Sequence, residues 1–163
     1  MKRRTFLQQS AALSAGALLA PLLTLATGKQ SPTIMIVSGW QDVNIGDITH
    51  TPGLIGLLRK RLPKAKLILW KKSESEKVDR LLMKNYPALR IVHGSYDKDL
   101  VPQTEEIKQA FSEADIFIHG SGPSVVGADN VRSWVKQTGK PFGIFGVTIQ
   151  EVNPALKELL QKA

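Results

Sequence analysis

The sequence predicts an α/β domain in which five parallel strands form one sheet with helices on both faces. Short apolar runs alternate strictly with longer segments in which apolar residues recur at helical spacing. The runs are continuous rather than alternating, which is typical of strands buried on both faces of a sheet. Because crossovers between parallel strands are right-handed, the favoured arrangement is doubly wound, with the strand order 3-2-1-4-5.

Five apolar runs are the predicted strands, and each of the five following segments carries a helix start or stop signal. Thr51 is predicted to cap the first helix, with Pro52 at its first position. A capping box of Ser73 and Glu76 is predicted to start the second helix. The strands are expected at residues 33–37, 66–70, 89–92, 116–118 and 142–145, and further helix signals are Thr104, Gly139 with Pro141, and Asn153 with Pro154.

Residues 1–28 are predicted to be a signal peptide that precedes a Rossmann-like domain at residues 29–163. A charged start is followed by an almost uncharged run from Ala11 to Gly28, and the small residues Thr24 and Ala26 suit cleavage after Ala26. The adjacent Arg3 and Arg4 resemble the twin-arginine type read by the Tat export machinery. This predicts a periplasmic or cell-envelope protein without a stable membrane span after cleavage, although a permanent N-terminal anchor stays an alternative.

Composition is globular and the charge is basic. The chain has 163 residues, of which 42% are apolar and 22% charged, and its net charge is +8. Residues 29–163 hold 19 basic and 14 acidic residues, a surplus that suits anionic ligands or simple solubility. No nucleic-acid motif appears, so nucleic-acid binding is not expected. The absence of cysteine excludes disulfides and thiolate chemistry.

Two glycine-bearing loops are predicted to face each other across a crevice. Loops 38–50 and 119–127 follow the first and fourth strands, which are neighbours in the order 3-2-1-4-5. Ligands of open α/β sheets bind beyond the carboxyl ends of the strands, at the point where the strand order reverses. The sequence therefore predicts a ligand cleft between these two loops.

In the first loop, hydrogen-bonding groups surround a glycine. Asn44 and Asp47 flank Gly46 and are candidates to bind a ligand, or equally to cap the loop's own backbone. His50 suits a neutral donor or base, because it is expected just before a helix N-terminus; a loop histidine bonded to backbone is the alternative. Trp40 is a candidate to stack on a sugar ring, with core packing equally plausible.

In the second loop, His119 ends a predicted buried strand and opens a run of small residues. A catalytic or ligand-orienting role is reasonable because histidine titrates near neutral pH; a half-buried histidine bonded to a neighbouring loop is the alternative. Ser121 and Ser124 are predicted donors to a phosphate or sugar hydroxyl, since no nucleophile-elbow pattern is present. The candidate catalytic residues are His119, Asp47 and His50, and the candidate ligand-binding residues are Asn44, Gly46, Gly120, Ser121, Gly122, Ser124 and Trp40.

The remaining polar features are read as structural. His93 ends the third strand, farther from the predicted crevice, and is expected to have a structural role. The three histidines lie on three different loops without metal-ligand spacing, so no metal is predicted. The basic residues between Arg59 and Lys72 are interpreted as a solvated face.

Three segments, in this order and spacing, resemble the polysaccharide pyruvyl transferase family. They are Asn44-Ile-Gly-Asp47 with the apolar helix after it, Ala114-Asp-Ile-Phe-Ile-His-Gly-Ser-Gly-Pro-Ser124, and Gly139-Lys-Pro-Phe-Gly-Ile-Phe-Gly146. The resemblance covers about residues 33–150. It implies two Rossmann-like domains in a glycosyltransferase-B-type arrangement, and transfer of the pyruvyl group of phosphoenolpyruvate to a cell-surface saccharide acceptor without a cofactor. His119 and Ser121 stand where that family usually has glycines.

Two functions remain open. The chain is expected to be the N-terminal, acceptor-side half of a pyruvyl transferase-like protein, inactive without a second domain. The alternative is an exported module that binds a carbohydrate or a small anion without catalysis. A flavodoxin-like or receiver-like domain fits the layout, but the acidic cluster and phosphate-binding loop of those domains are missing.

Overall fold

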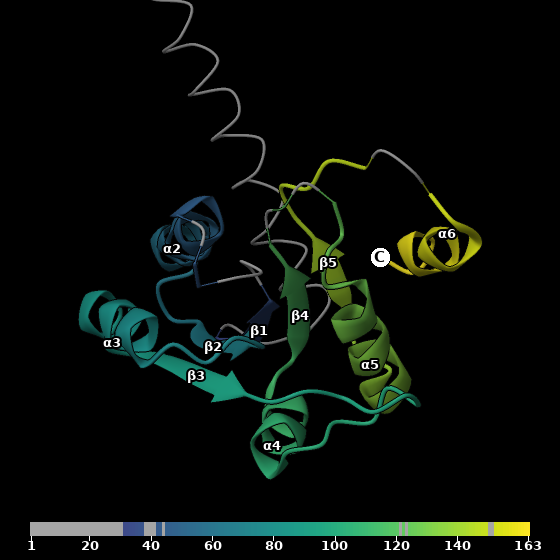
Figure 1. Ribbon diagram of the computed structural model, residues 1–163, viewed down its shortest axis with the longest axis horizontal. Helices are drawn as coiled ribbons and strands as arrows, with labels where there is room; N and C mark the ends of the chain where they lie inside the picture. The colour runs from purple at the N-terminus through teal and green to yellow at the C-terminus, as the bar shows by residue number, and fades with distance from the viewer. Residues whose placement is uncertain (1–30, 38–41, 44, 121, 123, 150–151) are drawn as a thin grey trace, which may run out of the picture.

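The computed structural model describes residues 31–37, 42–43, 45–120, 122, 124–149 and 152–163. Its centre is a five-stranded sheet with the order β3-β2-β1-β4-β5, in which every neighbouring pair is parallel (Figure 1). The predicted order is therefore confirmed. The strands are β1 (Thr33–Val37), β2 (Lys66–Lys71), β3 (Leu89–His93), β4 (Ile116–His119) and β5 (Phe142–Ile144).

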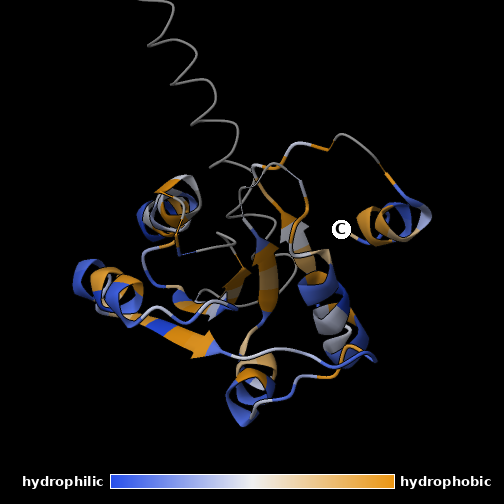
Figure 2. Cartoon of the chain, in the orientation of Figure 1, coloured by the Kyte–Doolittle hydropathy of each residue, from blue (hydrophilic) through white to orange (hydrophobic). Residues whose placement is uncertain are grey.

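Helices cover both faces of the sheet, as predicted. Their bounds are α2 (Ile45–Arg61), α3 (Glu76–Asn85), α4 (Glu105–Glu113), α5 (Ala128–Thr138) and α6 (Pro154–Leu160). Residues of α2 and α3 pack with one side of the strands, and residues of α4, α5 and α6 pack with the other (Figure 1). The strands are buried from both sides, which explains why β3 and β4 are mostly hydrophobic in Figure 2.

Several predicted helix ends are confirmed by local geometry. The side chain of Thr104 accepts a hydrogen bond from the backbone N–H of Ile107, and that of Asn153 accepts one from Leu156. Gly139 ends α5 in the left-handed conformation, with φ 62°. These signals depend only on residues three or four positions apart, so the local sequence is enough to predict them.

Two predicted helix starts are wrong. The helix after β2 begins at Glu76, and Ser75 occupies the cap position without a side-chain hydrogen bond, so the capping box of Ser73 and Glu76 does not form. The helix after β1 begins at Ile45, which places Thr51 and Pro52 inside α2 rather than at its start. Partly buried Ile48 extends the apolar side of α2 that packs on the sheet, and this tertiary packing outweighs the loss of one backbone N–H at Pro52.

The face beneath α4 and α5 is held by a cluster of aromatic rings. Trp70 meets Phe111 and Phe117 edge-on, and Trp134 also packs against both phenylalanines, with ring centroids 5.3–6.4 Å apart. The indole N–H of Trp70 donates to the backbone oxygen of Gly94, so the one polar group of this buried ring has a hydrogen-bond partner. None of the helices that the structure describes is long and apolar enough to cross a membrane.

Candidate functional site

The predicted site lies where β1 and β4 run side by side. Val37 and His119, the last residues of these strands, are partners in the register, and the backbone N–H of Gly120 donates to the oxygen of Val37 at 2.7 Å. The N-termini of α2 and α5 follow the same two strand ends. The sheet thus brings the described residues among 42–50 and 119–127 to one edge, as the strand order requires.

His119 is buried and bonded to its own loop. Its side chain is 1% exposed, and Nε2 accepts a hydrogen bond from the backbone N–H of Gly127 at 2.9 Å. An accepting Nε2 means that the neutral ring carries its proton on Nδ1, and this buried Nδ1 has no hydrogen-bond partner among the described residues. Burial lowers the pKa of His119, and the backbone of Gly120 and of His119 itself opposes this to a smaller extent. The ring therefore stays neutral at pH 7.

Gly127 is where the second loop packs against both strands. A Cβ atom at this position would lie 3.0 Å from Cδ2 and 3.1 Å from Nε2 of His119, and 3.2 Å from Cγ1 of Val37. Few real Cβ atoms approach other atoms this closely, so the absence of a side chain lets the start of α5 lie directly on the imidazole. His119 consequently positions the loop, whatever else it does.

The glycine loop is also joined to the segment after β5. The backbone N–H of Gly122 donates to Gly146 at 3.4 Å, and the N–H of Thr148 donates to Gly122 at 3.3 Å. The N–H groups of Gly120 and Gly122 are therefore both engaged within the protein. Ser124 is exposed at the same edge. The ligand-binding roles of Gly120, Gly122 and Ser124 stay predictions.

The candidates of the first loop are only partly described. Gly46 and His50 lie in the opening turns of α2, so His50 is inside the helix rather than before it, and its buried Nδ1 has no partner among the described residues. The predicted roles of Trp40, Asn44 and Ser121 fall on residues outside the described ones, as does the side chain of Asp47.

A buried ion network occupies the ends of β2 and β3, and sequence analysis did not single it out. Nζ of Lys71 forms ion pairs with Asp42, at 2.9 Å, and with Asp79. The other oxygen of Asp79 lies 2.7 Å from Nε2 of His93. The prediction of a solvated basic face is wrong for Lys71, which is 8% exposed. A signal existed, because Lys71 and His93 end neighbouring strands and are register partners.

Asn130 is a second polar residue that sequence analysis missed. It lies in the first turn of α5 and is completely buried, and neither its amide nitrogen nor its amide oxygen has a hydrogen-bond partner among the described residues. Burying an amide without a partner costs free energy, so Asn130 is a local cost to the stability of the fold. No motif marks Asn130, because a polar residue at a helix start is ordinary.

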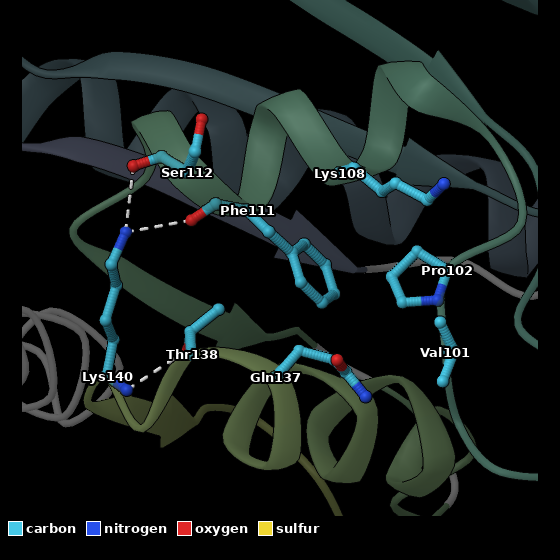
Figure 3. A pocket seen from close by; sticks show the side chains of 8 residues that line it. All are labelled: Val101, Pro102, Lys108, Phe111, Ser112, Gln137, Thr138 and Lys140. Atoms are coloured by element: carbon cyan, nitrogen blue, oxygen red, sulfur yellow. Dashed lines mark hydrogen bonds between the residues drawn. The ribbon is translucent and has the colours of Figure 1, made fainter.

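A cavity lies elsewhere, between α4 and α5 (Figure 3). Its volume is about 420 Å³, and Phe111 and Pro102 line it. At one end, Nζ of Lys140 donates to the backbone oxygens of Phe111, Ser112 and Ala114, which satisfies the C-terminal carbonyls of α4. This cavity contains none of the predicted site residues. Within the described parts of the chain, no three His, Asp or Glu side chains are grouped so that they could hold a metal ion.

Comparison with known protein families finds no family model that matches this chain, and comparison with curated proteins finds no match either.

Proposed function

We propose that this chain is an exported Rossmann-like domain that binds a saccharide or a small anion beyond the carboxyl ends of β1 and β4. The observation that carries the proposal is the reversal of strand order between these two strands, with the glycine-bearing segments at the same edge. Open parallel sheets bind their ligands at this point, because the flanking crossovers leave in opposite directions and open a crevice.

The start of α5 suits an anionic or hydroxyl-rich ligand. Gly127 is its N-cap, so no side chain caps the first backbone N–H groups of the helix. Those groups carry the positive end of the helix dipole and attract negative charge. Exposed Ser124 would add directional hydrogen bonds.

Binding can be located by recording backbone amide NMR spectra of the full chain. Three probes represent the ligand classes: inorganic phosphate, phosphoenolpyruvate and a neutral methyl glycoside. At least one probe is expected to shift the amide signals of Gly46, Gly120, Gly122 and Ser124 in a saturable way. Gly139, at the opposite end of α5, is the internal control and should not move. If no probe shifts these signals, or if Gly139 shifts equally, the proposed site is wrong.

A second candidate function is the acceptor-side domain of a pyruvyl transferase-like protein. It is favoured by the three segments that resemble this family, which fall at the start of α2, at β4 with its loop, and at β5. Donor binding is expected from a second domain, and a single open crevice does not exclude water from a transferred group. The purified chain should therefore not transfer pyruvate from phosphoenolpyruvate to a sugar. Detection of a pyruvylated sugar would contradict this expectation.

Export is part of the proposal and has its own test. Replacing Arg3 and Arg4 together by lysine keeps the charge but removes the twin-arginine pair. The variant should remain in the cytoplasm, whereas the parent chain should reach the periplasmic or envelope fraction. Equal export of both chains would rule out the Tat route.

A further inference from the structure

An apolar groove runs between α2 and α3, on the opposite side of the sheet from α4 and α5. Its first part has a volume of about 550 Å³, and its apolar lining is Ile45, Ile48, Val78 and Leu81. A second part of about 380 Å³ shares Ile48, Val78 and Leu81 and continues to Asn85 and Tyr86. We call these two parts together the α2–α3 groove. Figure 1 shows α2 and α3 as neighbours along this face.

A hydrogen bond joins the two helices at one end of the groove, and exposed apolar side chains lie at the other end. The hydroxyl of Tyr86 donates to the backbone oxygen of Pro52 at 3.0 Å, which ties the end of α3 to the middle of α2. At the opposite end, Ile45 is 74% exposed, and Leu81, which lines both parts of the groove, is 53% exposed. Exposed apolar side chains that continue an apolar groove are typical of a surface that another protein covers.

One rim of the groove is cationic. Lys77, Arg80 and Lys84 all line it, and their spacing places them in one row along α3, next to Leu81. Lys77 and Lys84 have no carboxylate partner among the described residues, and Arg80 forms only an exposed pair with Glu76 at 3.4 Å. Asp42, at the end of the groove, is already paired with Lys71. The rim therefore offers positive charge to whatever lies in the groove.

We propose that the α2–α3 groove binds an amphipathic helix of a partner protein, with acidic residues beside its apolar stripe. Two parallel helices with an apolar floor accept a third helix whose anchors recur at i, i+3, i+4 and i+7. The ten residues of α3 give the groove a length of about 15 Å, which corresponds to roughly three helical turns of the partner. The row of cations selects acidic residues and fixes the orientation of the partner.

Other occupants fit these features less well. A second copy of the chain placed symmetrically on the same surface would bring two rows of cations together, which is unfavourable. An acyl chain is held by side chains that point into an enclosed cavity, whereas Ile45 and Leu81 project into solvent. An apolar floor without exposed aromatic rings does not suit nucleic acid.

The test uses the full chain and a fluorescent synthetic helix of about four turns, with leucine at the anchor positions and glutamate beside them. Fluorescence anisotropy should show saturable binding with a Kd of the order of 10 to 100 μM. Leu81→Ser, and the pair Lys77→Glu with Lys84→Glu, should each weaken binding by about tenfold or more. All three residues are exposed, so the fold should be retained, and circular dichroism with thermal unfolding checks this.

The matched control is the pair Lys98→Glu and Lys157→Glu, which makes the same charge change at exposed lysines outside the groove and should leave the Kd unchanged. A second control is the same peptide with lysine in place of glutamate, which should bind at least about tenfold more weakly. Absence of binding, equal loss in the control variant, or equal binding of both peptides would overturn the proposal. Two further results would overturn it. One is that Leu81→Ser abolishes dimer formation by the chain but leaves the binding of the acidic peptide unchanged. The other is that Leu81→Ser abolishes binding to anionic vesicles but leaves the binding of the acidic peptide unchanged.

Discussion

Two histidines end two strands of the same sheet, and their surroundings differ completely. His119, at the end of β4, is buried, neutral and bonded to a backbone N–H. His93, at the end of β3, lies against the carboxylate of Asp79, which also binds Lys71. The carboxyl end of β4 is therefore held by close packing and neutral hydrogen bonds, whereas the carboxyl ends of β2 and β3 are held by charges.

Removing the central cation should affect stability most. Lys71→Met leaves the largely buried carboxylates of Asp42 and Asp79 without their shared counter-charge. We expect a loss of about 3 to 5 kcal/mol in the free energy of unfolding, measured with urea. The control is Lys108→Met, which removes an exposed ion pair with Glu105 and should cost less than about 0.5 kcal/mol. Equal losses would mean that the β2–β3 network is no stronger than a surface pair.

Filling the space beside His119 should have the next largest effect. In Gly127→Ala, the new methyl group meets the imidazole and Val37 at 3.0 to 3.2 Å, so one of them must move. We expect a loss of about 1 to 3 kcal/mol in the same unfolding experiment. Gly53→Ala is the matched control, because a Cβ there meets nothing within 4 Å and a helical alanine should stabilise by about 0.5 to 1 kcal/mol. A neutral Gly127→Ala would show that the loop adjusts freely.

The free energy of unfolding should also depend on pH through His119, at the carboxyl end of β4. Because burial lowers the pKa of His119, the unfolded chain binds this proton first as the pH falls below about 6.5. The stability linked to His119 is complete above that pH and is lost as the pH falls toward the lower pKa of the folded state, with a slope of at most about 1.4 kcal/mol per pH unit. His119→Gln keeps an acceptor for Gly127 and should remove this part of the slope. An unchanged slope between pH 7 and 5 would contradict a buried neutral imidazole.

The smallest effect is expected at Asn130, and its sign is informative. Asn130→Leu replaces an unpartnered buried amide with an apolar group of similar size. The free energy of unfolding should rise by up to about 1 kcal/mol, because the cost of burying the amide disappears. A destabilised variant would indicate that the amide has a partner within the fold.

The predictable parts of this chain depend on short-range patterns. Apolar runs and helical stripes were enough for the sheet order, because right-handed crossovers leave few alternatives. The caps at Thr104 and Asn153 involve residues three positions apart. By contrast, α2 starts earlier than the sequence predicts, because packing of Ile48 on the sheet overrides the local start signal formed by Thr51 and Pro52.

The candidate site divides in the same way. The sequence alone determined which strand ends lie together, and hence predicted that loops 38–50 and 119–127 share one edge of the sheet. Only the tertiary structure decided what their side chains meet. Lys71 is buried because Asp42 and Asp79, from two other segments, neutralise it. His119 is neutral because β1 and the start of α5 enclose it. Local periodicity depends on residues that are close in sequence. Burial and charge pairing depend on residues that are distant in sequence, and only the folded chain brings those together.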